Sequence, residues 1–278
     1  MFTLAYGPRG FSFTLARFYT HLVDIALPRL RRIARRNLEL AGYPEAEWDR
    51  IAGEVFASIG RLLVTIARFP RMDRENVGEW IRYDGLHHFH EAKRRGRGVL
   101  FATAHFGNWE LSAFAHGLLT EPMNVVVRPL DNPRIDALVE SRRRLSGNRL
   151  IGKWEWARGI LRALAANEAV GILIDQNSSL QEGVFIDFFG VAACAGAGFA
   201  RIAAKTGAAV IPGFAIWSAD EQRYVLRFYP PVHMTGDAHA DTQQLHRLLE
   251  AVIREHPGQW LWIHRRWKTR PPGDAAIY

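Results

Sequence analysis

The sequence predicts an α/β fold in which a mixed, largely parallel central sheet is flanked by helices and preceded by an N-terminal helical segment. Apolar residues follow helical spacing up to about residue 70, whereas short β-prone runs alternate with amphipathic stretches from Trp80 onward. This alternation is typical of a sheet covered by helices on both faces. With 278 residues, 48% of them hydrophobic, the chain is long enough to bury one large core.

The β-prone runs and the helices between them organise the second part of the chain. The runs are residues 98–104, 123–128, 169–175, 208–217 and 223–229. Helices are expected at residues 86–95, 109–119, 132–145, 155–167, 196–206 and 239–255. We predict a membrane-associating helical segment over residues 1–80 and an α/β domain over residues 81–278, the two forming one continuous structural domain.

The N-terminal segment is expected to form helices over residues 11–41 and 46–69, with Pro28 kinking or splitting the first. The second half of that first helix is rich in arginine: Arg29, Arg31, Arg32, Arg35 and Arg36. Such a pattern suits the surface of an anionic bilayer, and it equally suits the solvated face of a packed helix. Charged residues interrupt the apolar run well short of the roughly 20 apolar residues that a spanning helix needs. We therefore expect peripheral attachment through residues 2–40.

The charge balance of the chain limits the classes of partner. A net charge of +8 favours a nucleic acid, an anionic lipid surface or an acidic protein. No nucleic-acid reading helix, zinc finger or RNA-recognition motif is recognisable, so we expect no nucleic-acid partner. The single cysteine excludes an internal disulfide framework and suits a reducing compartment. Residues 1–30 lack the pattern of a secretory signal.

Several other motifs do not predict a metal or cofactor site. The histidines at positions 87, 88 and 90 have no cluster of cysteines or acidic residues beside them, so we expect no metal ion. Cys194 lies among alanines and glycines without an adjacent histidine, which indicates a small buried side chain. Gly196 and Gly198 resemble part of a dinucleotide fingerprint, but no strand directly precedes them, and we expect no cofactor.

The segment His105-Phe-Gly-Asn-Trp-Glu110 is the most informative motif, of the form H-x4-E. It follows an apolar, β-prone run, and the sites of α/β sheets lie at the carboxyl ends of strands. Residues five apart in a continuous helix lie about 140° apart. The Gly107-Asn108 turn is expected to bring His105 and Glu110 together as an oriented general base. The alternative is an ordinary strand-to-helix connection, with Glu110 favourable in the first helical turn.

Further motifs follow this one in order along the chain. They are Val127-Arg-Pro-Leu-Asp-Asn-Pro133, Arg143-Arg-Leu-Ser-Gly-Asn148, Ile174-Asp-Gln176, Gly183-Val-Phe-Ile-Asp-Phe-Phe-Gly190 and Trp262-Ile-His-Arg-Arg-Trp-Lys-Thr-Arg-Pro271. In this order and spacing, residues 30–273 resemble the late (lauroyl and myristoyl) acyltransferases of bacterial lipid A biosynthesis. These enzymes are related to the phosphatidylinositol mannoside and glycerolipid acyltransferases. Members usually begin with a membrane-spanning helix, and this sequence departs from that pattern.

The resemblance implies acyl transfer from an acyl thioester, carried by acyl carrier protein or coenzyme A, to a hydroxyl of a membrane glycolipid, most simply a lipid A precursor. The reaction would take place on the cytoplasmic side of the inner membrane. His105 would act as general base, and Glu110 would hold its other ring nitrogen. The chain has no G-x-S-x-G motif to supply a serine nucleophile, so direct transfer is expected.

The resemblance also implies roles for residues outside the first motif. Arg143 would stabilise the oxyanion or bind a phosphate, and Asp175 would orient either His105 or Arg143. The expected substrate-binding residues are Arg128, Asn108, Gln176, Arg265 and Arg266. Other acceptors remain open, namely a phosphatidylinositol mannoside or a lysophospholipid. A catalytically inactive protein that binds lipid or acyl carrier is a further alternative.

Overall fold

The central sheet fixes the position of every element that carries a candidate site residue. The structure is a computed structural model that describes residues 2–152 and 155–278. Its larger sheet has seven strands in the order β1-β9-β8-β2-β5-β3-β4. In chain order these are β1 (Ile81–Asp84), β2 (Val99–Thr103), β3 (Asn124–Val127), β4 (Arg149–Gly152), β5 (Ala169–Leu173), β8 (Ala209–Ser218) and β9 (Arg223–Phe228).

Five neighbouring strands of this sheet, β8-β2-β5-β3-β4, run parallel to one another. At the other edge β9 pairs antiparallel with β8, and β1 pairs parallel with β9. The predicted mixed, largely parallel sheet is therefore confirmed. A separate hairpin, β6 (Gly183–Phe188) and β7 (Val191–Gly196), forms a second, two-stranded sheet.

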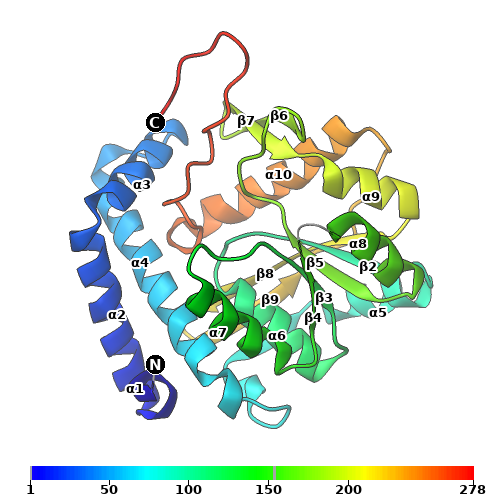
Figure 1. The fold of residues 1–278 in the computed structure, drawn as a ribbon. Helices are drawn as coiled ribbons and strands as arrows, with labels where there is room; N and C mark the ends of the chain where they lie inside the picture. Colours follow the sequence, from blue (N-terminus) through cyan, green and yellow to red (C-terminus); the bar gives the residue numbers. More distant parts are fainter. Residues whose placement is uncertain (1, 153–154) are drawn as a thin grey trace.

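Helices cover both faces of the larger sheet, as Figure 1 shows. They are α5 (Leu86–Arg94), α6 (Trp109–Leu119), α7 (Pro133–Arg144), α8 (Trp156–Ala165), α9 (Gly198–Thr206) and α10 (Ala238–Glu255). Alternate residues of β2 belong to opposite faces. Phe101 packs with residues of α5 and α6 in one core cluster, whereas Leu100 packs with residues of α8, α9 and α10 in another.

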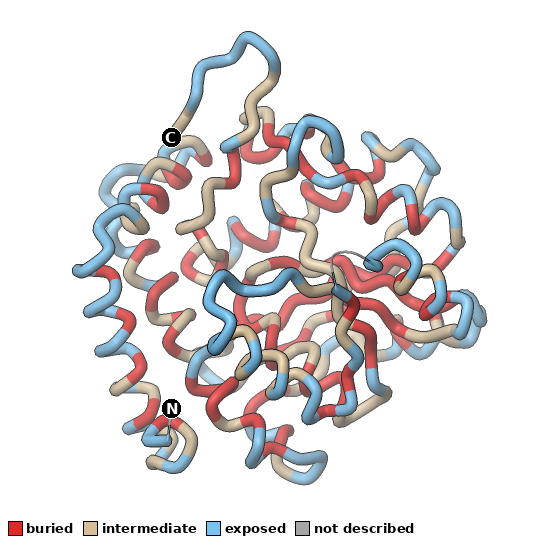
Figure 2. The backbone as a smooth tube through the Cα atoms, in the orientation of Figure 1, coloured by how far each residue is buried: buried red, intermediate tan, exposed pale blue. Residues whose placement is uncertain are grey.

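The N-terminal helices are α1 (Phe2–Tyr6), α2 (Arg9–Ala26), α3 (Pro28–Leu40) and α4 (Glu45–Arg68). Pro28 occupies the first turn of α3, where a missing N–H costs nothing, so the predicted split falls at that residue. Figure 2 shows that much of α4 is buried, while α2 alternates between buried and exposed residues. Residues 2–152 and 155–278 contain no helix that is both long and apolar enough to cross a bilayer.

Helix α2 reverses the usual arrangement of an amphipathic helix. Its inward face consists of small or polar side chains, at Ser12, Ala16, Thr20 and Asp24. Phe13 and Leu15 near its start pack partly buried against the core. Other large apolar side chains are exposed and, at spacings of seven, four and three residues, form one stripe: Phe11, Phe18, Leu22 and Ile25. The small side chains allow a close approach to α4, where the Gly60 Cα lies against the Ala16 backbone.

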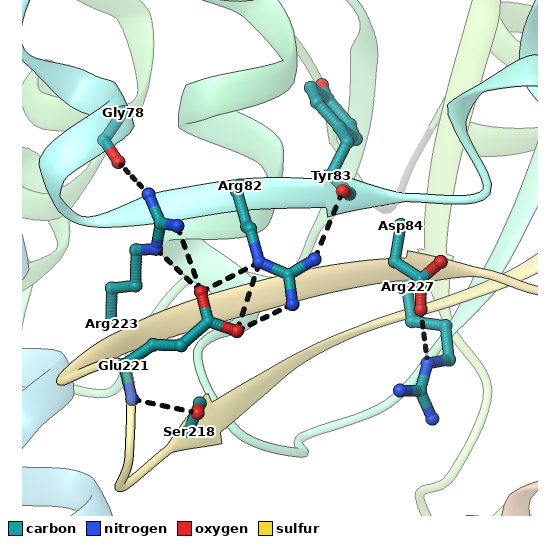
Figure 3. A network of polar contacts seen from close by, with 8 residues as sticks. All are labelled: Gly78, Arg82, Tyr83, Asp84, Ser218, Glu221, Arg223 and Arg227. Carbon is teal, nitrogen blue, oxygen red and sulfur yellow. Dashed lines mark hydrogen bonds and ion pairs between the residues drawn. The ribbon is translucent and has the colours of Figure 1, made fainter.

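Every predicted β-run and every predicted helix of residues 81–278 is present, with boundaries that differ by at most two residues. The sequence reasoning missed the short edge strands β1 and β4 and the β6–β7 hairpin. At the edge of the sheet, ion pairs join β1 to β9 and to the turn that precedes β9 (Figure 3). Glu221 accepts hydrogen bonds from Arg82 and Arg223, and Arg227 pairs with Asp84 at 2.9 Å.

Candidate active site

Two adjacent parallel strands, β2 and β5, place the side chains of His105 and Asp175 at the same end of the sheet. In the β2–β5 ladder Thr103 lies opposite Leu173, and the Ile174 N–H donates to the Thr103 carbonyl at 2.9 Å. His105 and Asp175 each follow two residues later. Because the strands are parallel and in register, their side chains emerge side by side at the carboxyl ends, where α/β sheets place their sites.

Asp175 holds the His105 imidazole through one oxygen and the His105 backbone through the other. His105 Nδ1 lies 2.9 Å from Asp175 Oδ1, and the His105 N–H donates to Oδ2 at 3.0 Å. The indole N–H of Trp260 also donates to Oδ2 at 2.9 Å. Since a carboxylate can only accept, Nδ1 carries the proton and Nε2 of the neutral ring is free to accept one.

The expectation that Glu110 binds the other ring nitrogen of His105 is wrong. The Gly107 backbone does bend, with φ of +57°, and a Cβ there would lie 1.8 Å from the Ala215 carbonyl oxygen. The bend starts α6 at Trp109 and turns Glu110 toward α7. There the Glu110 carboxylate accepts two hydrogen bonds from Arg143, at 2.8 Å from Nε and 2.6 Å from Nη2.

The surroundings of His105 keep its partner charged and its own pKa high. Burial by itself would lower the pKa of His105, but the Asp175 carboxylate outweighs burial, and the net pKa is raised above the ordinary 6.5. Burial would raise the pKa of Asp175. The His105 imidazole, the His105 backbone N–H and the Trp260 indole N–H together lower that pKa well below its usual range. The His105 side chain retains 18% exposure, whereas that of Asp175 retains 3%.

The Arg143–Glu110 pair is also partly buried, with side-chain exposures of 17% and 8%. Burial would lower the pKa of Arg143, but the hydrogen bonds that it donates to the Glu110 carboxylate raise it overall, so the guanidinium stays charged. Two of its five N–H donors are bonded to Glu110, which leaves donors for an oxyanion or a phosphate. Helix α7, which carries Arg143, has no buried residue of its own.

A cavity of about 1010 Å³ opens beside these two pairs. His105, Glu110, Arg143 and Gln176 lie at its polar end. The remainder is lined mainly by apolar side chains of α4, α6 and the strands, among them Leu62, Ile66, Phe101, Phe114, Val125 and Phe228. A charged end with an apolar interior is the form expected of a site for an amphipathic substrate.

Comparison with known proteins identifies the family. Residues 1–269 match the sequence profile of the bacterial lipid A biosynthesis acyltransferases. The chain belongs to this family. It is 31% identical to the lipid A biosynthesis palmitoleoyltransferase of Escherichia coli K12 over 267 residues, which cover 93% of this chain and 86% of that enzyme. It is 30% identical to the lauroyltransferase of the same organism over 91% of this chain and 83% of that enzyme.

The E. coli lipid A biosynthesis myristoyltransferase is more distant, at 24% identity over 89% of this chain and 78% of that enzyme. Family membership makes the protein an O-acyltransferase, with an acyl donor and a lipid acceptor. The resemblance of residues 30–273 that the ordered motifs indicated is confirmed.

The structure of this acyltransferase brings some of the expected substrate-binding residues to the cavity and leaves others elsewhere. Exposed Arg128 and Gln176 line it, and the Gln176 amide nitrogen lies 3.4 Å from His105 Nε2. Asn108 is completely buried and caps α6, with Oδ1 accepting from the Leu111 N–H and Nδ2 donating to Thr65 Oγ1. Its amide is therefore structural rather than available to substrate.

Arg265 and Arg266 are not among the residues that line the cavity of the acyltransferase. Arg265 lies over the ring of Tyr278. Arg266 has no exposed surface, donates to the Cys194 carbonyl at 2.7 Å and lies over the Phe188 ring. Burial lowers its pKa to about 10. Arg266 thus joins the C-terminal segment to the β6–β7 hairpin, whereas the contact of Arg265 lies within the C-terminal segment.

Trp260 is the site residue that sequence reasoning missed. Its indole is buried, and its N–H supplies one of the hydrogen bonds to Asp175. The only signal was its place two residues before the Trp262–Pro271 motif. The residues described, 2–152 and 155–278, contain no group of three or more His, Cys, Asp or Glu side chains arranged to hold a metal ion.

Proposed function

We propose that the protein transfers a fatty acyl chain from an acyl thioester to a hydroxyl group of a lipid A precursor, with His105 as general base. The observation that carries this proposal is the His105–Asp175 pair at the charged end of an apolar cavity. The donor is an acyl carrier protein or coenzyme A thioester, both of which suit a chain with net charge +8.

Proton transfer follows from the tautomer that Asp175 fixes. His105 Nε2 accepts the proton of the acceptor hydroxyl as its oxygen attacks the thioester carbonyl carbon. The tetrahedral intermediate collapses when the carbon–sulfur bond breaks, and the imidazolium returns its proton to the leaving sulfur. Asp175 stabilises the imidazolium in between, as the carboxylate of a catalytic triad does. No acyl-enzyme is needed, because the donor carbonyl and the acceptor oxygen meet directly.

The ion pair beside His105 places the positively charged guanidinium of Arg143 in the site, while Glu110 balances its charge. Glu110 neutralises Arg143 and fixes the plane of its guanidinium through two hydrogen bonds. The remaining N–H groups then face an oxyanion or a substrate phosphate. Arg128, exposed on the cavity rim, is the second candidate for a phosphate contact. In this proposal Glu110 acts through Arg143 and is a positioning residue.

The apolar surface around the cavity supports a peripheral position on the cytoplasmic side of the inner membrane. Large apolar side chains on the cavity rim are exposed: Leu63, Leu130, Ile135 and Trp156. The stripe on α2 adds further exposed apolar area at the N-terminal side. A lipid substrate would reach the cavity from a bilayer that contacts these surfaces. Washing membranes with high salt and at alkaline pH should release the protein; retention through both washes would contradict this proposal.

The decisive experiment compares purified wild-type protein with His105→Ala and with the control His87→Ala, which changes an exposed histidine of α5. Radiolabelled acyl thioesters are offered with a lipid A precursor, a phosphatidylinositol mannoside or a lysophospholipid. We expect transfer to the lipid A precursor, lost by at least about 100-fold in His105→Ala only. Full activity of a folded His105→Ala would exclude the mechanism, and preference for another acceptor would exclude the proposed substrate.

A further inference from the structure

Helices α8 and α9 form one continuous surface beside the cavity. Trp156 at the start of α8 and Gly198 at the start of α9 both line the cavity, and a Cβ added to Gly198 would lie 2.5 Å from Trp156 Cη2. The helices lead into strands β5 and β8, which are both parallel to β2, so they run in the same direction. Their inner faces pack in one core cluster. Their outer faces therefore extend together, away from the cavity.

The outer faces of these two helices carry four basic side chains. Arg158 and Arg162 are four residues apart on α8, and Arg201 and Lys205 are four residues apart on α9, so each pair shares one face of its helix. All four are exposed. Every ion pair within residues 2–152 and 155–278 involves other side chains. We call these four residues the α8–α9 basic surface.

The acidic residues nearest in sequence do not balance this surface. Neither helix contains an acidic residue, and Glu155 alone stands directly before α8. Glu168, which follows α8, pairs instead with Arg149 of β4 at 2.6 Å. Helix α3 differs, because three of its five arginines form ion pairs with acidic residues of α2, α3 and α4. The α8–α9 basic surface therefore keeps an excess of positive charge that the fold does not neutralise.

The surroundings of this surface favour an acidic protein over a bilayer. Helices that lie on membranes combine cations with large apolar side chains. Among the described residues of α8 and α9, only Trp156 is both large, apolar and exposed, and it stands at the cavity. Figure 1 shows α8 and α9 on the opposite side of the molecule from α2, which carries the exposed apolar stripe. A bilayer that contacts that stripe leaves the basic surface facing away from it.

The spread of the four cations distinguishes between the two forms of acyl donor. Arg162 and Lys205 lie one helical turn, about 6 Å, farther from the cavity than Arg158 and Arg201. Of the four, only Arg201 lines the cavity. Phosphates of coenzyme A would need cations gathered at the cavity, whereas cations spread over two exposed helices match an extended acidic surface. We propose that the α8–α9 basic surface docks the acidic acyl carrier protein that delivers the acyl chain. This inference rests on the proposed function.

The test reverses the two cations that lie farthest from the cavity. The variant combines Arg162→Glu with Lys205→Glu. Its control combines Arg29→Glu with Arg32→Glu, which makes the same change of charge at exposed positions of α3. Steady-state transfer of one saturated acyl chain, from acyl carrier protein or from coenzyme A, is measured in detergent. We expect the KM for acyl carrier protein to rise about ten-fold or more at low ionic strength, with kcat unchanged.

The control and the second donor give this result its meaning. The control variant should keep the wild-type KM, and the variant should change transfer from coenzyme A by less than two-fold. Added salt should narrow the difference between variant and wild type, because it screens exposed charges. An equal loss with both donors would assign the cations to the arm or phosphates that the donors share, and would overturn the inference. Should the charge reversal not fold, Arg162→Gln with Lys205→Gln removes the same charges.

Binding measurements separate this inference from the proposed function. Fluorescence anisotropy of labelled acyl carrier protein without an acyl chain reports docking without transfer, and flotation with phosphatidylglycerol vesicles reports binding to a bilayer. If wild-type protein transfers no acyl group but only the α8–α9 variant loses affinity for the carrier, the proposed function fails and the docking surface stands. Unchanged affinity and KM in the folded variant overturn the inference. Loss of vesicle binding without loss of carrier binding also overturns it, in favour of a membrane contact.

Discussion

Two histidines on or next to α6, His105 and His116, line the cavity, and their environments are opposite. His105 is partly exposed and bonded to the buried carboxylate of Asp175, which raises its pKa against the effect of burial. His116 is buried among phenyl rings and bonded to a phenol, so burial dominates and lowers its pKa to about 3. The partner of the ring, rather than the ring itself, decides whether it exchanges protons. His105 is therefore suited to proton transfer, whereas His116 is held as a neutral ring inside the fold.

Among the variants that test this comparison, removing the charge of Asp175 should have the largest effect on the rate of transfer. In Asp175→Asn the carboxylate that fixes the His105 tautomer is lost while the side-chain shape remains, and we expect kcat to fall by about 100-fold or more. Trp260→Phe is the matched control, because it removes a single N–H donor to the same oxygen. Steady-state rates with saturating donor measure both. A fall of less than three-fold in Asp175→Asn would mean that another group orients His105.

The second-largest effect concerns the pH dependence of transfer, which should follow the ionisation of His105 beside Asp175. A general base must be neutral, so kcat/KM should rise with pH through an apparent pKa above 6.5. Asp175→Asn removes the charge that raises this pKa and leaves burial, which lowers it. Residual activity of the variant should therefore persist to lower pH than that of wild type. An acid limb that does not move between the two proteins would show that a different group titrates.

A double-mutant cycle distinguishes the two roles considered for Glu110. If Glu110 acts only by holding Arg143, then Glu110→Gln should lower kcat/KM about ten-fold in wild type, or about 1.4 kcal/mol, and have little further effect in Arg143→Gln. Arg143→Lys should rescue little, because a lysine cannot form the two parallel hydrogen bonds seen here. Additive effects of Glu110→Gln and Arg143→Gln would instead support a direct action of Glu110 on substrate or His105.

The smallest predicted effect concerns the pH dependence of stability, in which the two histidines have opposite signs. The raised pKa of His105 contributes stability below pH 6.5 that is lost as pH rises through its folded pKa. The lowered pKa of His116 contributes stability above pH 6.5 that is lost as pH falls from 6.5 toward about 3. His116→Leu should therefore reduce the protons taken up on unfolding at about pH 5 by nearly one. Calorimetric Tm values across pH measure this, and an unchanged acid slope would show that His116 is already charged in the fold.

Local patterns were enough to predict most of the fold and part of the site. Hydrophobic periodicity placed the long helices and buried strands because those segments are long and their apolar spacing is regular. Strands β1 and β4 have four residues each, of which only two are apolar or aromatic, whereas the equally short β3 contains three consecutive valines. His105 and Asp175 were expected at strand ends, and Arg143 near them. The asparagine before α6 is a typical helix N-cap, so the structural role of Asn108 was also within reach of the sequence.

The pairing within the site depends on information that no local pattern contains. Glu110 is five residues from His105 in the chain, and Asp175 is seventy residues away. Asp175 nevertheless binds the imidazole, because β2 and β5 are neighbours in the sheet. Strand order is a property of the whole fold, and so is the burial of Arg266 against the β6–β7 hairpin. The family resemblance led us to expect that arginine at the substrate, because a sequence does not show which cations are covered.

Helix α7 has a consequence for how the site adapts to its lipids. It has no buried residue, yet it supplies Arg143, whereas the imidazole and its carboxylate stand on two central strands. A bulky headgroup that displaces α7 would therefore move the guanidinium and leave the proton acceptor where it is. The cation can follow the size of the molecule being modified, while the group that activates its hydroxyl keeps a constant position. Under the proposed mechanism, the contact with the headgroup and the chemical step would thus belong to separate layers of the protein.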